Sequence, residues 1–305
     1  MAAIAYVTDE TMLEYHRFNG SHSIVFWRLS SKKFSDFKEG DLLFFLSYSD
    51  VVGKVKEKGL TGCGCYTGSE SLTITAMWKK YGTATGYSTK KELTDAIVKS
   101  CKTEELPKKI SCLLLDKVVF FQMPIYLSKL GYNISNKLES FTYLDKNDGA
   151  QTLMLLKEAQ KVGIDYWTSI VNDNLNDELF NRLIMKYQIS TIYESMSLKS
   201  NIPAKKAETI FELYSDESSM WVNQQKYSFI TFQPEPKLYF IHDSLMKDSV
   251  ENFYRLLGEL MNLRLAIKEE LSEDIAIKVL CIRPLTENQI KVLENYNIEV
   301  ENIEL

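Results

Sequence analysis

The stretch Lys38-Glu-Gly-Asp-Leu-Leu-Phe-Phe-Leu46 decides the fold of the first half of the chain. Its first four residues have the composition of a turn, and the five apolar residues after them have the length and composition of a strand. A second strand is predicted at Gly62-Cys-Gly-Cys-Tyr-Thr-Gly68, where glycine permits bends or the close approach of another segment. We therefore expect the first half to consist of short strands joined by turns.

Other segments of the first half fit this pattern. Apolar, β-prone composition predicts further strands at residues 24–27, 110–115, 118–121 and 138–144. Helical spacing of apolar residues predicts helices at residues 72–80 and from Ser88 onward. The polar cluster Asp145-Lys-Asn-Asp-Gly149 is typical of a turn. We place the domain boundary there, which gives predicted domains at residues 1–149 and 150–305.

Charge and glycine content also distinguish the two halves. Residues 1–149 carry 20 Lys and Arg against 17 Asp and Glu, whereas residues 150–305 carry 16 against 24. Eleven of the 13 glycines precede residue 150. The basic half is the better candidate for contact with a polyanion, and the acidic half could meet a basic protein partner.

Composition excludes several classes of protein. Hydrophobic residues make up 45% of the chain and charged residues 25%, as in globular proteins and unlike disordered or collagen-like chains. No apolar run reaches the roughly 20 residues that span a bilayer, so we expect no membrane association. The N-terminus does not resemble a signal peptide. Five cysteines without paired spacing suggest free thiols and a cytoplasmic protein.

The second half combines helices with a small sheet. Helical patterns predict helices at residues 150–162, 175–187, 203–213, 246–270 and 287–294. A hairpin is predicted at 227–242, and strands at 275–282 and 298–303. In the longest helix, Phe253, Leu257 and Leu260 are expected to be buried. The order of these elements indicates a helical and α/β domain, and the whole chain is expected to be α+β.

A family resemblance emerges from the first half. The succession of Trp27, Phe37-Lys-Glu-Gly-Asp-Leu-Leu-Phe-Phe45 and Leu60-Thr-Gly-Cys-Gly-Cys65 resembles PUA-like domains, especially those of the EVE type attached to modification-dependent restriction systems. Met77-Trp-Lys-Lys-Tyr-Gly82 and Ile110-Ser-Cys-Leu-Leu-Leu115 also look like segments of that family. The resemblance covers residues 22–145 and implies a small closed β-barrel. This chain departs from the family pattern in an insertion at about 69–105 that is rich in helix signals.

The resemblance implies that the mouth of the barrel accepts a flipped, often modified, base, and we expect DNA or RNA as the partner. A flipped base needs a flat apolar slot and polar groups at its edge. The candidate slot walls are Trp27, Tyr48, Trp78 and Tyr81; Ser47 and Thr61 could bond the base edge; and Arg28, Lys32, Lys33, Lys79 and Lys80 could hold phosphates. The alternative is that both tryptophans are core residues and that the lysines are solvated.

Cofactor and metal signatures are weak. Cys63 and Cys65 are spaced as Cys-x-Cys, which is not the spacing of a zinc knuckle. The three histidines His16, His22 and His242 form no ligand pair. No glycine segment has the sequence of a phosphate-binding loop. We therefore predict no cofactor, with Mg²⁺ required only if the second domain is a nuclease.

The second domain has the element order of an Asp…Glu-x-Lys nuclease core. Asp216, Glu235 and Lys237 fit that motif, in which two carboxylates hold Mg²⁺ and the lysine orients or activates water. Two prolines, however, place Glu235 in the turn Gln233-Pro-Glu-Pro236, whereas the motif belongs within a strand.

The strand after that turn ends in His242-Asp-Ser244 and supplies no second lysine. A working nuclease, an inactive relative and an unrelated α/β domain all remain open. The leading hypothesis is a nucleic-acid-binding protein that recognises a flipped base, in a restriction or phage-defence context. The alternatives are a Mg²⁺-dependent, modification-dependent endonuclease and a protein-interaction module that binds no nucleic acid.

Overall fold

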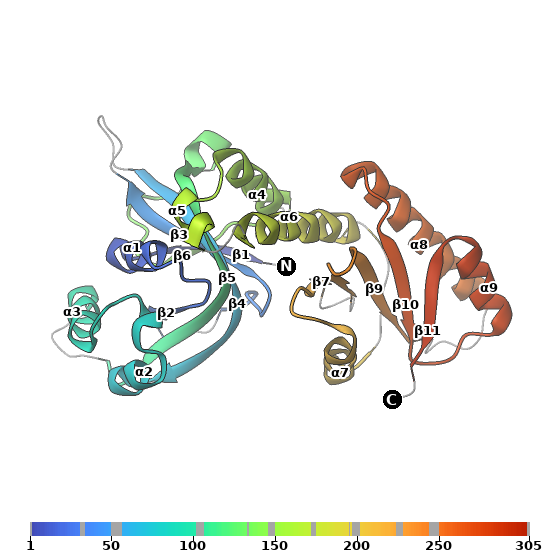
Figure 1. The fold of residues 1–305 in the computed structure, drawn as a ribbon, viewed down its shortest axis with the longest axis horizontal. Coiled ribbons are helices and arrows are strands. Elements are labelled where there is room, and N and C mark those ends of the chain that lie inside the picture. Colours follow the sequence, from blue (N-terminus) through green and yellow to red (C-terminus); the bar gives the residue numbers. More distant parts are fainter. Residues whose placement is uncertain are drawn as a thin grey trace. The chain divides into compact units, whose positions relative to one another are not determined.

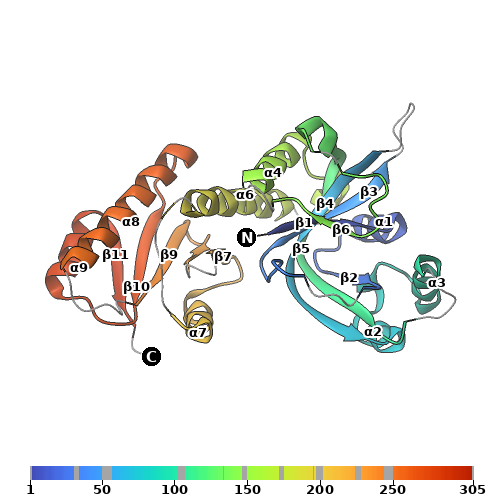
Figure 2. The same cartoon turned by 180° about the vertical axis from the view of Figure 1, so that it is seen from behind.

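The computed structural model describes residues 2–30, 34–49, 57–101, 107–132, 134–145, 150–171, 175–194, 196, 202–223, 228–243 and 250–303. The chain forms two compact units, Met1–Asn181 and Arg182–Leu305. Each unit contains one sheet with helices (Figures 1 and 2), which confirms the α+β class. The predicted boundary after Gly149 stays a prediction, because residues 146–149 lie outside the described part.

The sheet of the first unit has six strands in the order β2-β5-β4-β3-β1-β6. Their bounds are β1 Ala3–Val7, β2 Ile24–Arg28, β3 Leu42–Ser49, β4 Glu57–Leu72, β5 Ile110–Tyr126 and β6 Phe141–Tyr143. Strands β1 and β3 are parallel, and the other pairs are antiparallel. Among the described residues no pairing joins the end strands β2 and β6, so the predicted closed barrel is not confirmed.

The sheet curls strongly although it stays open. The ring of Tyr6 on β1 lies 4.9 Å from that of Phe26 on β2 and 5.8 Å from that of Phe141 on β6. Because three strands separate β1 from β2 within the sheet, this contact requires the two ends of the sheet to approach each other. The core therefore lies on the concave face, where Phe45 and Phe120 are also buried.

Irregular pairing shapes the long strands β4 and β5. The predicted strands 110–115 and 118–121 are parts of one strand, β5. Its pairing with β4 is irregular near Lys117, whose φ is +53°. Gly62 has no room for a side chain, since a Cβ there would lie 2.5 Å from the carbonyl oxygen of Val119. The predicted close approach at this glycine is thus confirmed.

Helices join the strands of the first unit. They are α1 Glu10–Phe18, α2 Ile74–Tyr81, α3 Lys90–Ser100, α4 Ala150–Val162 and α5 Tyr166–Val171, with short 3₁₀ segments η1 Gly82–Thr85 and η2 Leu127–Leu130. Helices α2 and α3 lie in the predicted insertion. The side chain of Asp9 caps α1 by accepting a hydrogen bond from the amide of Met12 at 3.0 Å.

The second unit has a five-stranded sheet in the order β11-β10-β9-β8-β7. The strands are β7 Met220–Asn223, β8 Ser228–Thr231, β9 Lys237–His242, β10 Ala276–Cys281 and β11 Ile298–Asn302. Strands β7, β8 and β9 form an antiparallel meander, and β10 and β11 continue parallel to β9. The predicted hairpin and the two later strands are confirmed.

Helices of the second unit accompany this sheet (Figure 1). They are α7 Ala204–Tyr214, α8 Val250–Leu271 and α9 Glu287–Asn295, while α6 Leu175–Glu194 contains the dividing point between the units. Ile210 of α7 packs in one core cluster with Phe229 and Ile241. Phe253, Leu257 and Leu260 of α8 are buried as predicted. No described helix is long and apolar enough to cross a bilayer.

Candidate functional site

A cavity of about 140 Å³ lies beside α1 in the first unit. Helix α1 contributes the polar side chains of Glu10, Glu14 and Arg17, while Ser47 of β3, Thr61 of β4 and Gln122 of β5 complete the polar lining. Leu13, Phe120, Phe121 and Pro124 supply apolar walls. The cavity thus combines a small apolar space with hydrogen-bonding groups from four elements.

Helix α1 presents its lining residues because of their spacing. Residues 10, 13, 14 and 17 follow the 3, 4, 7 spacing of one helix face. On another face of α1, His16 is fully buried, and its Nδ1 lies 3.1 Å from the hydroxyl of Ser21. Burial lowers the pKa of His16 from 6.5 to about 4, so the imidazole is neutral at pH 7.

Thr61 reaches the cavity through a β-bulge. Along β3 and β4, Phe45 pairs with Gly62 and Leu46 with Leu60, so Thr61 is the additional residue between two paired positions. The same residue is skipped in the pairing of β4 with β5. Such a bulge redirects one side chain relative to its neighbours. It brings the Thr61 hydroxyl to the cavity that Ser47 also lines.

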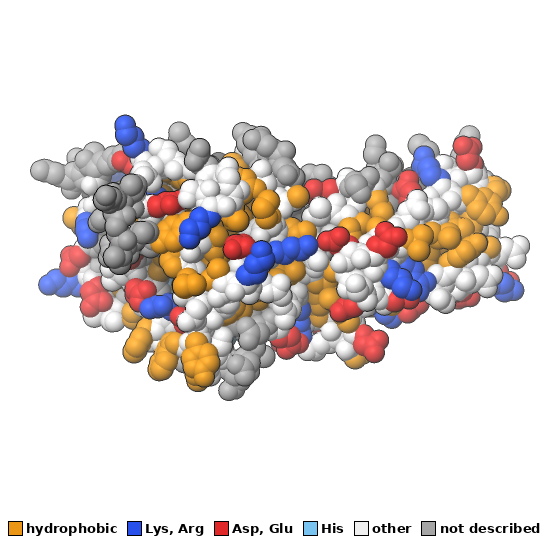
Figure 3. Space-filling model, turned by 90° about the horizontal axis from the view of Figure 1, so that it is seen from above, with side chains coloured by type: hydrophobic (Ala, Val, Ile, Leu, Met, Phe, Trp, Pro, Cys, Tyr) orange, Lys and Arg blue, Asp and Glu red, His pale blue; other side chains and the backbone are white. Residues whose placement is uncertain are grey.

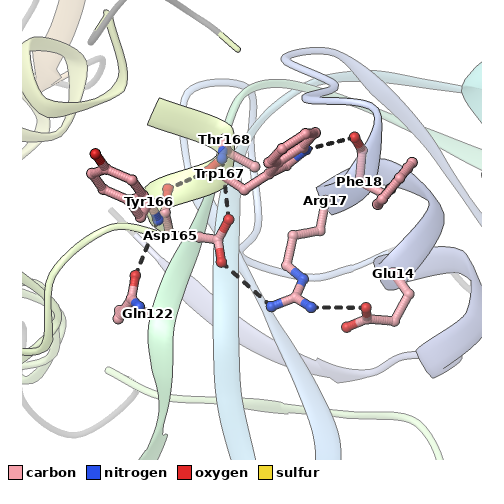
Figure 4. A network of polar contacts seen from close by, with 8 residues as sticks. All are labelled: Glu14, Arg17, Phe18, Gln122, Asp165, Tyr166, Trp167 and Thr168. Atoms are coloured by element: carbon pink, nitrogen blue, oxygen red, sulfur yellow. Dashed lines mark hydrogen bonds and ion pairs between the residues drawn. The ribbon is translucent and has the colours of Figure 1, made fainter. Parts of the chain in front are cut away.

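Two ion pairs hold Arg17 at the cavity (Figure 4). Its guanidinium lies 2.9 Å from the Glu14 carboxylate and 3.4 Å from Asp165, the residue before α5. Gln122 is fixed as well, because its amide oxygen accepts a hydrogen bond from the backbone N–H of Tyr166 at 3.0 Å. The amide nitrogen is then the group that Gln122 can offer to a ligand.

Exposed aromatic side chains occupy the start of α5. Trp167 stacks on Phe18 with ring centroids 5.7 Å apart and planes 19° apart. The indole N–H of Trp167 donates to the carbonyl oxygen of Phe18 at 2.8 Å (Figure 4). Phe18 is 71% exposed, Trp167 51% and Tyr166 72%. Adjacent exposed aromatic rings form an apolar patch, and such patches can mark an interaction site.

The structure brings Ser47 and Thr61 together but places the predicted slot walls elsewhere. Trp27 is buried and contacts Tyr87, whereas Trp78 of α2 is half-buried against the core. Tyr81 is half-buried beside it. Tyr48 is exposed, and its hydroxyl donates to the carbonyl oxygen of Asn136 at 2.9 Å. None of these four is among the described residues that line the cavity.

The predicted phosphate-binding residues are also dispersed. Arg28 is buried, with its guanidinium over the ring of Phe34 at 4.3 Å. Lys79 is exposed, and Lys80 forms a 2.8 Å ion pair with Glu70. Lys32 and Lys33 lie outside the described residues. Their nucleic-acid-binding role stays a prediction.

The candidate nuclease residues have other partners. The carboxylate of Asp216 accepts hydrogen bonds from the backbone N–H of Ser218 at 2.7 Å and the hydroxyl of Ser219 at 2.9 Å. Burial raises the pKa of Asp216, but hydrogen bonds from these serines outweigh it, so the pKa lies below its ordinary value. Lys237 forms a 2.9 Å ion pair with Glu299 of β11, and Glu235 is exposed in the turn.

At the end of β9, Asp243 forms a 3.2 Å ion pair with Arg283. Ser244, the last residue of the predicted strand end His242-Asp-Ser244, lies outside the described residues. In the described part of the chain, no group of three or more His, Cys, Asp or Glu side chains is placed to share a metal ion.

Sequence reasoning missed Glu10, Glu14, Arg17, Gln122 and Trp167. A signal for α1 was available, since Asp9 is a good N-cap and the 3, 4, 7 spacing starts directly after it. Asp165-Tyr-Trp-Thr168 similarly combines a cap residue with two adjacent aromatic residues. No local pattern could show that these segments meet at β5.

Solved structures offer a distant similarity. ASCH from Zymomonas mobilis is 13% identical, with a TM-score of 0.37, and the alignment covers 50% of this chain and 94% of that one. A mutant form of the same protein is 14% identical, with a TM-score of 0.35 and coverage of 51% and 96%. Similarity at this level assigns neither a family nor a function to this chain.

No protein-family model matches the chain. No curated protein matches it either.

Proposed function

We propose that the protein binds nucleic acid through its first unit and takes one base into the cavity beside α1. The observation that carries this proposal is the meeting of two hydroxyls, Ser47 and Thr61, at a space of about 140 Å³. A dry cavity of roughly 150 Å³ accommodates benzene, so a single six-membered ring is of suitable size. A larger drug-like ligand would need roughly 300 Å³ or more.

The lining suits the edge of a base. The Glu10 and Glu14 carboxylates can accept hydrogen bonds from amino or imino groups, and Gln122 can donate to a carbonyl or ring nitrogen. Phe120 and Phe121 provide apolar contact for the ring. Two carboxylates against the single guanidinium of Arg17 make the lining net negative, which disfavours phosphate, so the base and not the backbone is the group that fits this space.

A base can enter such a cavity only when it is unstacked. Single-stranded nucleic acid meets this condition at little cost, whereas a duplex must flip the base out at a cost of a few kcal/mol. The EVE-type resemblance of the sequence favours a flipped and modified base. The restriction or phage-defence context rests on that resemblance alone.

The hydroxyls provide a direct test of the proposal. Ser47→Ala and Thr61→Val should each weaken binding of a fluorescein-labelled single-stranded oligonucleotide by roughly twofold to tenfold, the value of one hydrogen bond. Fluorescence anisotropy at low salt measures the affinity. The matched control is Ser69→Ala, because Ser69 is an exposed residue of β4, the strand that also carries Thr61.

Either of two outcomes would contradict the proposal. One is failure of the wild-type protein to bind DNA or RNA of any composition at low salt. The other is unchanged affinity in a doubly substituted Ser47→Ala/Thr61→Val protein that retains the wild-type melting temperature.

For the second unit, we propose an inactive relative of the nuclease core. The order α7-β7-β8-β9-α8-β10, with β10 parallel to β9, supports the nuclease-type part of this proposal. The ion pair of Lys237 with Glu299 supports the inactive part. Incubation of modified and unmodified DNA with the protein and Mg²⁺ should yield no product. Cleavage by the wild type that is lost in Lys237→Ala would contradict the proposal of an inactive nuclease core.

A further inference from the structure

Phe18 and Trp167 form an exposed aromatic surface outside the cavity lining. We propose that the Phe18–Trp167 pair is a stacking platform for the base that neighbours the one in the cavity, so that the ligand is a single strand of at least two nucleotides. This inference rests on the proposed function. Figure 3 shows hydrophobic side chains at the surface of the molecule among basic and acidic ones, and Phe18 and Trp167 are both more than half exposed.

The indole ring of Trp167 is held in a fixed orientation. Its N–H is bonded to the Phe18 carbonyl oxygen at 2.8 Å, and the ring stacks on that of Phe18. With the N–H satisfied within the protein, the group that Trp167 offers to a ligand is a flat π-surface. A base stacks on such a surface whatever its identity, because every base has a π-face.

The helix that carries Trp167 is anchored on β5. The backbone N–H of Asp165 donates to the Phe120 carbonyl oxygen at 2.8 Å, and the Asp165 carboxylate accepts from the backbone N–H of Thr168 at 3.1 Å. Figure 4 shows the hydrogen bond from Thr168 to Asp165 together with the ion pair from Arg17. A surface that is already ordered loses little conformational entropy when a ligand binds.

Two residues of the cavity lining also contact the segment that carries Trp167. Arg17 and Gln122 both line the cavity, and both also hold the segment Asp165–Tyr166 in place. The aromatic pair is therefore carried by two segments, the end of α1 and the start of α5, that are tied to residues of the cavity lining. A base in the cavity would leave its neighbour on the same strand close to Phe18 and Trp167.

Length dependence of binding tests the platform. The probes are a deoxythymidine or deoxycytidine mononucleotide and single-stranded octamers of the same bases, each titrated into full-length protein by calorimetry. Trp167→Ala should weaken octamer binding roughly 5- to 150-fold, the range for loss of one stacked base. Mononucleotide affinity should change by less than twofold, and Trp167→Phe should recover most of the octamer affinity.

Controls separate the possible failures. Tyr254→Ala removes an exposed aromatic ring from α8 and should leave both affinities unchanged. Melting temperatures of all variants show whether they fold, and Phe18→Ala provides a second disruption of the platform. If the wild type binds neither these probes nor the corresponding purine and RNA probes at low salt, the proposed function fails together with the platform.

Two results would overturn the platform alone. The first is an octamer affinity that Trp167→Ala and Phe18→Ala leave unchanged. The second is an equal loss of mononucleotide and octamer affinity, which would place Trp167 in the cavity site. Binding of an apolar protein to this surface, with no effect of either variant on octamer affinity, would assign the aromatic pair to a protein interface.

Discussion

Leu257→Ala should lower the free energy of unfolding by about 2–5 kcal/mol, the usual loss when a buried leucine is truncated and a cavity remains. Leu257 is 6% exposed and lies on the buried face of α8 with Phe253 and Leu260. Figures 1 and 2 both show α8 beside the sheet of the second unit. Urea denaturation followed by circular dichroism measures the change.

Leu265 provides the matched control on the same helix. It is 57% exposed, so Leu265→Ala should change the free energy of unfolding by less than about 0.5 kcal/mol. Equal effects of the two substitutions would mean that the face carrying Leu257 does not form the core of this unit.

Acid should destabilise the protein through His16. Folding lowers the pKa of this imidazole from 6.5 to about 4, so between these values the unfolded chain binds a proton that the folded chain excludes. Stability therefore falls as the pH drops from about 6.5 to 4, and each unit of pKa difference is worth about 1.4 kcal/mol. Protonation of His16 should therefore lower the free energy of unfolding by about 3 kcal/mol over this pH range.

His16→Gln isolates this effect because glutamine does not titrate. Urea denaturation at pH values from 7 to 4 measures the unfolding free energy of both proteins. On acidification the wild type should lose about 3 kcal/mol more than the variant. His22→Gln, which removes another histidine, should retain the wild-type acid loss. A difference between wild type and His16→Gln that is constant with pH would show that His16 is not buried in its neutral form.

Most strands and helices could be predicted because their local patterns are strong. The run Leu42–Leu46 lies in β3, and the spacing around Leu257 marks the buried face of α8. The strand Ala3–Val7 was missed, because two of its five residues are alanines and all but the last are buried, which leaves no alternation to detect. Local patterns predict elements well when packing and propensity agree.

The candidate site was less accessible to sequence reasoning for two physical reasons. Thr61 lines the cavity only because a bulge shifts the register between β3 and β4, and nothing in the local sequence specifies that shift. The contact of Arg17 with Asp165 joins residues 148 positions apart. Trp27 shows the opposite problem, since a tryptophan that suits base stacking also suits a core, and here it is buried.

The position of β1 within its sheet affects how the chain can fold during synthesis. Ile4 pairs with Leu43 on one side and with Tyr143 on the other, so its second partner is translated long after its first. At roughly 5–20 residues per second, the ribosome needs roughly 5–20 s to pass from Leu43 to Tyr143. Throughout that time β1 has an unprotected edge that can pair with another nascent chain.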